Sequence, residues 1–187
     1  MKNEIVVFEG QIGEVVNFPQ PDGRKFEQYR RPPGTRLVIL SPEGKILITR
    51  EYRHETGDYD LRLPGGKVCD SLKEYKEFLG KDADLLSLAE AAAKKEALEE
   101  TGLIVQNIEF LAKANAGATV EWDLYYFLVK NYSDSSAGQE LELGEDIEIN
   151  WMSPSEIKEA VVAGKMQEWR SVGILLGIVF PKLNSNK

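Results

Sequence analysis

Hydrophobic residues occur in short alternating runs along the first third of the chain, a pattern that is typical of β-strands. Gly10 and Gly13 separate the first two runs and predict a hairpin. A later pair of runs is joined by Ser41-Pro42-Glu43-Gly44, which suits a type I turn and predicts a second hairpin. The strands expected in this region cover residues 4–8, 13–18, 25–31, 35–40 and 45–50.

Apolar residues recur at helical spacing after residue 70. An amphipathic helix is expected before Gly80, with its apolar face at Leu72, Tyr75, Phe78 and Leu79. Asp84 is a suitable N-cap for a longer helix that Gly102 ends. Ser153-Pro154-Ser155-Glu156 is a capping box, which predicts a helix over residues 154–163. Residues 104–113 and 122–130 are expected to be strands, and the polar residues 131–139 a flexible loop.

Composition narrows the class of protein and of partner. A chain of 187 residues, 42% hydrophobic and 29% charged, fits one globular domain with an N-terminal appendage. The net charge of −8 opposes binding to nucleic acid, although a small phosphorylated ligand could still bind in a pocket with local arginines. The single cysteine, Cys69, excludes an internal disulfide. No apolar run reaches about 18 residues, so we expect no membrane association and a cytoplasmic protein.

Three glutamates dominate the second predicted helix. Glu96 precedes Glu99 and Glu100 by three and four residues, so their carboxylates project from one sector of a helix. Like charges at this spacing destabilise a helix, and a divalent cation would offset that cost. Mg²⁺ prefers oxygen ligands and completes its coordination shell with water and substrate phosphates. The cluster therefore predicts one or more Mg²⁺ ions, for which Mn²⁺ could substitute, beside a phosphorylated substrate.

The glutamates also lie in a longer motif that resembles the signature of the Nudix hydrolases. Gly65-Gly66 opens this motif, and Glu96, Ala97, Glu99, Glu100, Gly102 and Leu103 match its close at the family spacing. The chain departs from the signature in having Lys95 for an arginine, Ser87 for a glutamate, Arg62 for a glutamate and an insertion at about residues 69–86. The insertion could cover the mouth of a pocket or a partner surface, or be a plain surface excursion.

The resemblance implies an α/β fold in which a mixed β-sheet is sandwiched between helices. Residues 34–187 would form the Nudix domain, and residues 1–33 a β-strand appendage of a kind that often completes a two-fold homodimer. The apolar tail, residues 168–180, would be a helix that ends at Pro181.

Two further stretches resemble the branch that hydrolyses ADP-ribose and other nucleoside diphosphate sugars. One is the strand that ends at Arg53. The resemblance implies that Arg53 contacts the substrate. The other is Glu145-Asp146-Ile147, which aligns with a metal-binding and catalytic loop. The branch's Ser-Pro-Gly loop is only partly kept, because Ala116 replaces the proline before Gly117.

The resemblance assigns a role to each candidate residue. The Gly65 carbonyl, Glu96, Glu99, Glu100 and Glu145 would hold the metal. The base position of the branch falls on Leu143, so the base would be Glu121, Glu142 or Glu145. Arg30 could reach the phosphates, and the candidates for stacking on the nucleobase are Phe26, Tyr29 and Trp122. His54 is expected to be an ordinary loop residue.

Together these residues predict Mg²⁺-dependent hydrolysis of a diphosphate bond, giving a nucleoside monophosphate and a sugar phosphate. Two alternatives stay open. The substrate could be a nucleoside triphosphate or a dinucleoside polyphosphate. The departures at Arg62, Ser87, Lys95 and Leu143 could instead mark a nucleotide-binding module that has lost turnover.

Overall fold

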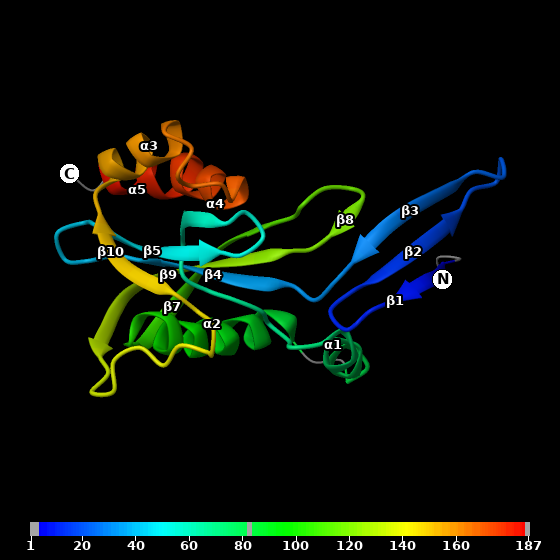
Figure 1. Cartoon of the computed structure of the whole chain (residues 1–187), viewed down its shortest axis with the longest axis horizontal. Helices are drawn as coiled ribbons and strands as arrows, with labels where there is room; N and C mark the ends of the chain where they lie inside the picture. The colour runs from blue at the N-terminus through cyan, green and yellow to red at the C-terminus, as the bar shows by residue number, and fades with distance from the viewer. Residues whose placement is uncertain (1–3, 82–83, 186–187) are drawn as a thin grey trace.

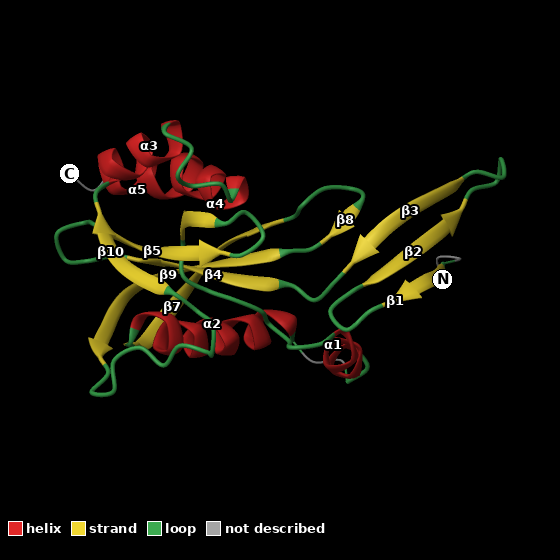
Figure 2. Cartoon of the chain, in the orientation of Figure 1, coloured by secondary structure: helices red, strands yellow, loops and turns green. Residues whose placement is uncertain are grey.

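The computed structural model describes residues 4–81 and 84–185, and its body has three layers (Figures 1 and 2). The middle layer holds two three-stranded sheets, one in the order β4-β9-β7 and the other in the order β10-β5-β6. Helix α2 covers one side, and α3, α4, η1 and α5 cover the other. The strands are β4 (Gly34–Ile39), β5 (Ile46–Arg53), β6 (Asp58–Arg62), β7 (Leu103–Ala114), β9 (Leu124–Asp134) and β10 (Ile147–Met152). The helices are α2 (Leu85–Thr101), α3 (Pro154–Val162), α4 (Trp169–Ile174), η1 (Leu175–Val179) and α5 (Phe180–Ser185).

Strand β4 and the first half of β9, residues 124–129, are buried on both faces, and most of their residues are apolar. On β4, Val38 packs into the core under the C-terminal helices, whereas Leu37 and Ile39 pack into the core under α2. Strand β9 pairs with β4 in parallel and divides its side chains in the same alternating way. The α/β sandwich predicted from the sequence is therefore confirmed.

Helix α2 is fixed at both ends by its own sequence. The Asp84 side chain accepts a hydrogen bond from Leu86 N–H, and Gly102 closes the helix in the left-handed conformation at φ 67°. Ala89, Ala93 and Ala97 are fully buried and let the helix lie close to the sheet. The last turns of α2 are thereby held against the strands. No helix of residues 4–81 and 84–185 has the length and apolar character needed to cross a membrane.

The N-terminal strands form an arm that projects from the body (Figure 1). Strands β1 (Ile5–Glu9), β2 (Glu14–Pro19) and β3 (Lys25–Arg30) pair antiparallel, as the alternation predicted. The short β8 (Val120–Glu121) extends this sheet by pairing in parallel with β3. The arm is therefore joined to the body by the chain after β3 and by the loop that leads into β9.

The insertion forms a helix at the base of the arm, α1 (Leu72–Leu79). Lys76 from α1 and Arg30 from β3 both pair with Glu14, whose side chain is only 1% exposed, at 2.7 Å each. Leu72 N–H also donates to the Gln11 carbonyl, 2.9 Å away. The insertion thus fastens the arm through a buried carboxylate that two cations neutralise.

Two boundaries differ from those expected. Strand β9 runs on to Asp134 through half of the predicted loop, because residues 131–134 pair with the start of β7. The C-terminal helix does not end at Pro181. Instead α4, η1 and α5 follow one another without a break, so the helical segment runs from Trp169 to Ser185 and Pro181 lies just after its π-helical turn.

Glu168 organises the start of the C-terminal helices. Its carboxylate accepts hydrogen bonds from Ser171 N–H at 2.8 Å and from Arg170 Nε at 2.7 Å, and Tyr126 Oη lies 3.2 Å away. Burial alone would raise the pKa of Glu168, but the hydrogen bonds from Ser171 and Arg170 lower that pKa to about 2. The charged form of Glu168 therefore stabilises the folded state.

The Glu168→Gln substitution should lower the free energy of unfolding at pH 7 by on the order of 3 kcal/mol. The pKa is lower in the folded state than in the unfolded state, so this contribution is complete above the unfolded value and is lost as the pH falls towards 2. Urea unfolding of both proteins between pH 7 and roughly pH 3 should show the difference shrinking by more than half. A difference that does not change with pH would contradict this role.

Candidate active site

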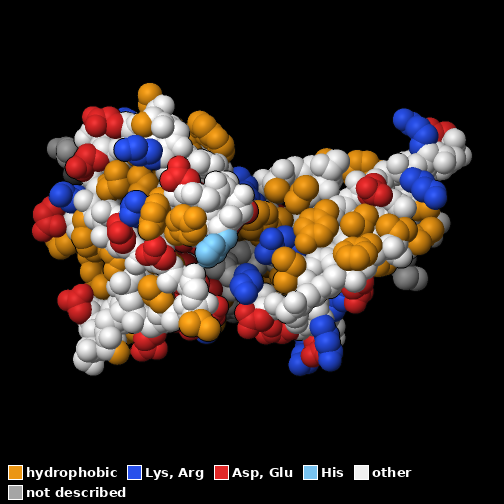
Figure 3. All heavy atoms as spheres, viewed as in Figure 1, with side chains coloured by type: hydrophobic (Ala, Val, Ile, Leu, Met, Phe, Trp, Pro, Cys, Tyr) orange, Lys and Arg blue, Asp and Glu red, His pale blue; other side chains and the backbone are white. Residues whose placement is uncertain are grey.

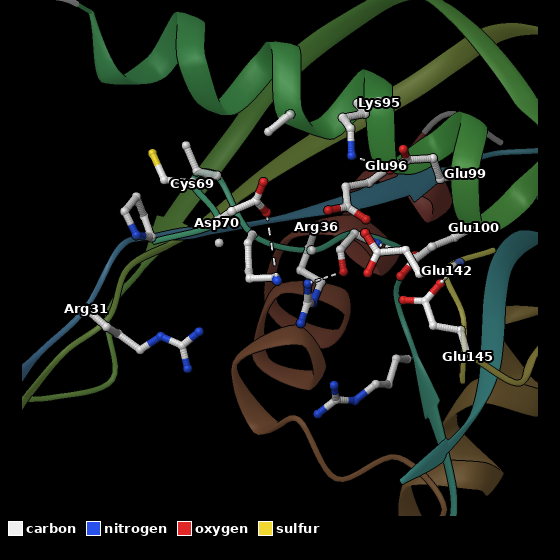
Figure 4. A pocket seen from close by; sticks show the side chains of 18 of the residues that line it. Arg31, Arg36, Cys69, Asp70, Lys95, Glu96, Glu99, Glu100, Glu142 and Glu145 are labelled. Atoms are coloured by element: carbon white, nitrogen blue, oxygen red, sulfur yellow. Dashed lines mark hydrogen bonds and ion pairs between the residues drawn. The ribbon is translucent and has the colours of Figure 1, made fainter. Parts of the chain in front are cut away.

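A cavity of about 790 Å³ lies between the last turns of α2, the Gly65-Gly66 loop and the ends of β4 and β5. Figure 4 shows the labelled glutamates gathered on one side, with Arg31 across the cavity and Arg36 between them. The acidic residues on this wall are Glu96, Glu99, Glu100, Glu142 and Glu145. The basic residues that line the cavity include Arg31, Arg36, Arg53 and Arg62. One cavity therefore brings carboxylate oxygens and guanidinium groups to face each other.

Glu100 and Glu96 lie directly against the two glycines of this loop. Gly65 N–H donates to Glu100 Oε2 at 2.7 Å. A Cβ on Gly66 would lie 2.1 Å from Glu96 Oε1, and a Cβ on Gly65 would lie 2.3 Å from the Thr35 carbonyl oxygen. Thr35 N–H holds the Gly66 carbonyl at 2.9 Å, which fixes the loop against β4. Only glycine lets the backbone approach both the helix and the strand this closely.

Both glutamates are costly to ionise in this position. Burial raises the pKa of Glu96 to about 7 and that of Glu100 to about 8. Repulsion from Glu99 and Glu145 adds to the shift at Glu96, and repulsion from Glu96 adds to that at Glu100. A bound cation would reverse this preference by stabilising the charged forms.

The donor set fits a hard divalent cation, although it is not assembled. Within residues 4–81 and 84–185, no three acidic, histidine or cysteine side chains converge closely enough to form a ready metal site. The reason lies in the present partners, because Glu99 pairs with Lys95 at 2.7 Å and Glu145 accepts Glu142 N–H at 2.9 Å. A cation bound by Glu99 and Glu145 would have to replace these two contacts.

Arg36, which the sequence analysis did not single out, lies among the glutamates. Its side chain comes from β4, the residue is only 7% exposed, and Nη1 donates to the carbonyls of Gly65 at 2.5 Å and Thr35 at 2.8 Å. Burial and the neighbouring Arg62 lower the pKa of Arg36, whereas Glu100 raises it. The Gly65 carbonyl, expected to be a metal ligand, therefore already accepts a hydrogen bond from a cation.

Arg31 is a second cavity residue whose role no motif in the sequence indicates. Its Nε is buried and has no hydrogen-bond partner in the described part of the chain. Its guanidinium lies over the Trp122 ring, 4.5 Å from the centroid, and Arg170 lies over the same ring at 4.3 Å. Trp122 is therefore occupied by two cations, which argues against its predicted role of stacking on a nucleobase.

The departures from the family signature have partners of their own. Arg62 pairs with Asp60 at 2.8 Å and lies 3.8 Å from Glu51. Ser87 Oγ donates to Asp84 at 2.6 Å and so supports the N-cap of α2. Lys95 pairs with Glu99, as described above. Each departure is thus accommodated locally.

Arg53 lines the cavity, as expected, but its guanidinium is held by Glu51 and Glu55 at 2.5 and 2.6 Å. Glu142 and Glu145 also line it, whereas the side chain of Leu143, at the base position of the resembled branch, points fully into solvent. His54 is exposed in a loop and contacts Tyr52 edge-on, as an ordinary loop residue would.

The structure places the remaining predicted residues on the arm. Glu121 and Arg30 line a separate hollow of about 650 Å³, together with Phe26. The ring of Tyr29 packs over Gly13, where an added Cβ would lie 2.3 Å from its hydroxyl. Glu121 therefore does not share a cavity with Glu96 and Glu100 in the single chain. The sequence could not reveal this separation, because it depends on the pairing of β8 with β3.

Known proteins resemble the chain in both sequence and structure. GDP-mannose pyrophosphatase from Enterobacter sp. (strain 638) is 27% identical over 170 residues, which cover 87% of this chain and 78% of that relative. The protein of the same name from Escherichia coli O1:K1 / APEC is 26% identical over 167 residues, with the same coverage. A crystal structure of an ADP compounds hydrolase shares the fold, with a TM-score of 0.71 at 18% identity over 98% of this chain and 93% of that one.

The family comparison agrees with the signature found in the sequence. The NUDIX domain matches residues 30–171, which include the glycine loop, helix α2 and the loop that holds Glu142 and Glu145. The chain therefore belongs to the Nudix hydrolase family, as its signature residues predicted.

Proposed function

We propose that the protein hydrolyses the diphosphate bond of a nucleoside diphosphate linked to a sugar, with Mg²⁺ as cofactor. The observation that carries this proposal is the contact of Glu96 and Glu100 with Gly65-Gly66, inside a cavity that arginines also line. The activities for which the relatives are named support a nucleotide sugar or an ADP compound as the substrate class.

Glu96, Glu99, Glu100 and Glu145 would hold the metal through carboxylate oxygens, the donors that Mg²⁺ prefers. When bound, Mg²⁺ would neutralise phosphate charge and lower the pKa of a water molecule. The raised pKa values of Glu96 and Glu100 support this assignment, because a buried carboxylate pair is most stable when a cation balances it.

The arginines would bind and orient the diphosphate. Arg31 is the strongest candidate, since it faces the cavity and pairs with no carboxylate within the described residues. Arg53 would need to leave Glu51 and Glu55 before it could bind a phosphate. A phosphate that bridges the arginines and the metal would be held for attack along one line.

We assign the general base to Glu142 and an orienting role to Glu145. Glu145 already accepts the backbone N–H of Glu142, which leaves its carboxylate partly engaged. The Glu142 carboxylate has no hydrogen-bond partner among residues 4–81 and 84–185, so it is free to take a proton from the attacking water. Glu121 could reach a site of this kind only if a second subunit brought it there.

The arm supports the proposal of a homodimer. Strand β1 lies at the edge of its sheet and exposes four consecutive apolar side chains, and many hydrophobic side chains lie along the visible face of the arm (Figure 3). The exposed fractions are 50% for Ile5, 44% for Val6, 52% for Val7 and 61% for Phe8. An edge strand with this composition is a favourable surface for a second copy of the chain.

The Glu100→Gln substitution should lower the Mg²⁺-dependent release of nucleoside monophosphate by roughly 100-fold, because it removes a charged metal ligand that touches the glycine loop. The assay should cover GDP-mannose, ADP-ribose, nucleoside triphosphates and dinucleoside polyphosphates. Glu109→Gln, at an exposed carboxylate on β7, is the matched control and should keep full activity. Binding of these nucleotides by the wild type with no turnover of any of them would favour the binding module instead.

The Arg31→Gln substitution should raise the KM for the nucleotide sugar by at least roughly tenfold, since a hydrogen bond to a charged phosphate is lost. Arg24→Gln is the control, because Arg24 is largely exposed on the arm and, among the residues that the structure describes, forms an ion pair only with Asp22. An unchanged KM in steady-state kinetics would show that Arg31 does not bind the substrate.

The double substitution of Ile5 and Val7 by lysine should convert the dimer into a single chain of 21.0 kDa, as measured by light scattering after gel filtration. Lysine on an edge strand opposes pairing with another chain. Val162→Lys, at an apolar side chain that is 89% exposed on α3, should leave the dimer intact. A wild type with the mass of one chain would refute the dimer.

A further inference from the structure

Arg36 has an arrangement that neither the signature nor the proposed reaction accounts for. It lies on a central strand, and no carboxylate oxygen is within ion-pair distance of it in the part of the chain that the structure describes. A buried guanidinium without a paired carboxylate is costly, so the surrounding groups must compensate for it. Those groups are backbone carbonyls and, at longer range, Glu100.

The position of Arg36 coincides with that expected of a metal ion. Its Nη1 is 2.5 Å from the carbonyl oxygen of Gly65. The N–H of the same glycine is 2.7 Å from Glu100. A divalent ion bound to the Gly65 carbonyl would therefore lie beside the guanidinium, where the two positive charges would repel each other. The guanidinium and the ion would therefore compete for the same carbonyl oxygen of Gly65.

We propose that Arg36 is a built-in cation that takes the place of one metal ion at the Gly65 carbonyl. The site would then bind its divalent ions through Glu96, Glu99, Glu100 and Glu145, and Arg36 would supply the positive charge at the Gly65 carbonyl in place of one further ion. This inference rests on the proposed metal site. It concerns how many ions that site holds and where they lie.

The neighbouring Arg62 does not have this role. It also lines the cavity, but Asp60 and Glu51 already balance its charge. Arg62 is therefore a suitable control, since its substitution removes a cation from the same chamber without exposing the Gly65 carbonyl.

Titration with MnCl₂, followed by the electron paramagnetic resonance signal of free Mn²⁺, counts the bound ions without any need for catalysis. Arg36→Gln should bind one more Mn²⁺ per chain than the wild type, because the charge at the Gly65 carbonyl is gone. Arg36→Lys keeps the charge and should bind the wild-type number, as should Arg62→Gln. Adding Glu100→Gln to Arg36→Gln should abolish the extra site.

Equal numbers of ions in the wild type and in a folded Arg36→Gln protein would overturn this inference and leave the proposed function standing. A wild type that binds no Mn²⁺ would overturn both. If Arg36→Gln does not fold, NMR of the wild type labelled with ¹⁵N-arginine decides the matter. The guanidinium protons of Arg36 should stay protected from exchange with water when Mg²⁺ saturates the protein, and their loss of protection would show that the metal displaces the arginine.

Discussion

The close contact between the last turns of α2 and the Gly65-Gly66 loop is the constraint on which the site depends. It places Glu100 on the N–H of Gly65 and the carboxylate of Glu96 over Gly66, at distances that no side chain on either glycine would permit. The contact brings two acidic groups into a poorly solvated place, where their charges repel. The fold therefore maintains a position with a strong demand for positive charge.

Arginines from several parts of the fold supply positive charge near these two glutamates. Strand β4 supplies Arg36 from below the glycine loop, and β6 supplies Arg62 beside it. Arg31 lies at the junction of the arm and the body. Its guanidinium packs on the Trp122 ring, across the cavity from the glutamates. Strand β4, which carries Arg36, is buried on both faces, so the backbone position of this arginine is fixed. Positive charge is thus preorganised where an anionic substrate would lie.

Local signals in the sequence predicted the elements that local chemistry controls. The caps of α2 at Asp84 and Gly102 were predicted correctly, as were the arm hairpin and the clustering of Glu96 with Glu100, because each depends on residues near one another in the chain. The roles of Arg31 and Arg36 escaped prediction. A strand arginine has no distinctive spacing, and its partners come from loops that only the tertiary fold brings together. The extension of β9 escaped for the same reason, since its partner is β7.

Anomalous diffraction from crystals grown with Mn²⁺ and a non-hydrolysable nucleotide sugar is the most direct test of the central claim. We expect at least one anomalous peak within coordination distance of Glu96 or Glu100, with the diphosphate between that peak and Arg31. Glutamates that keep their present contacts, with no peak in the cavity and the nucleotide bound elsewhere, would contradict it.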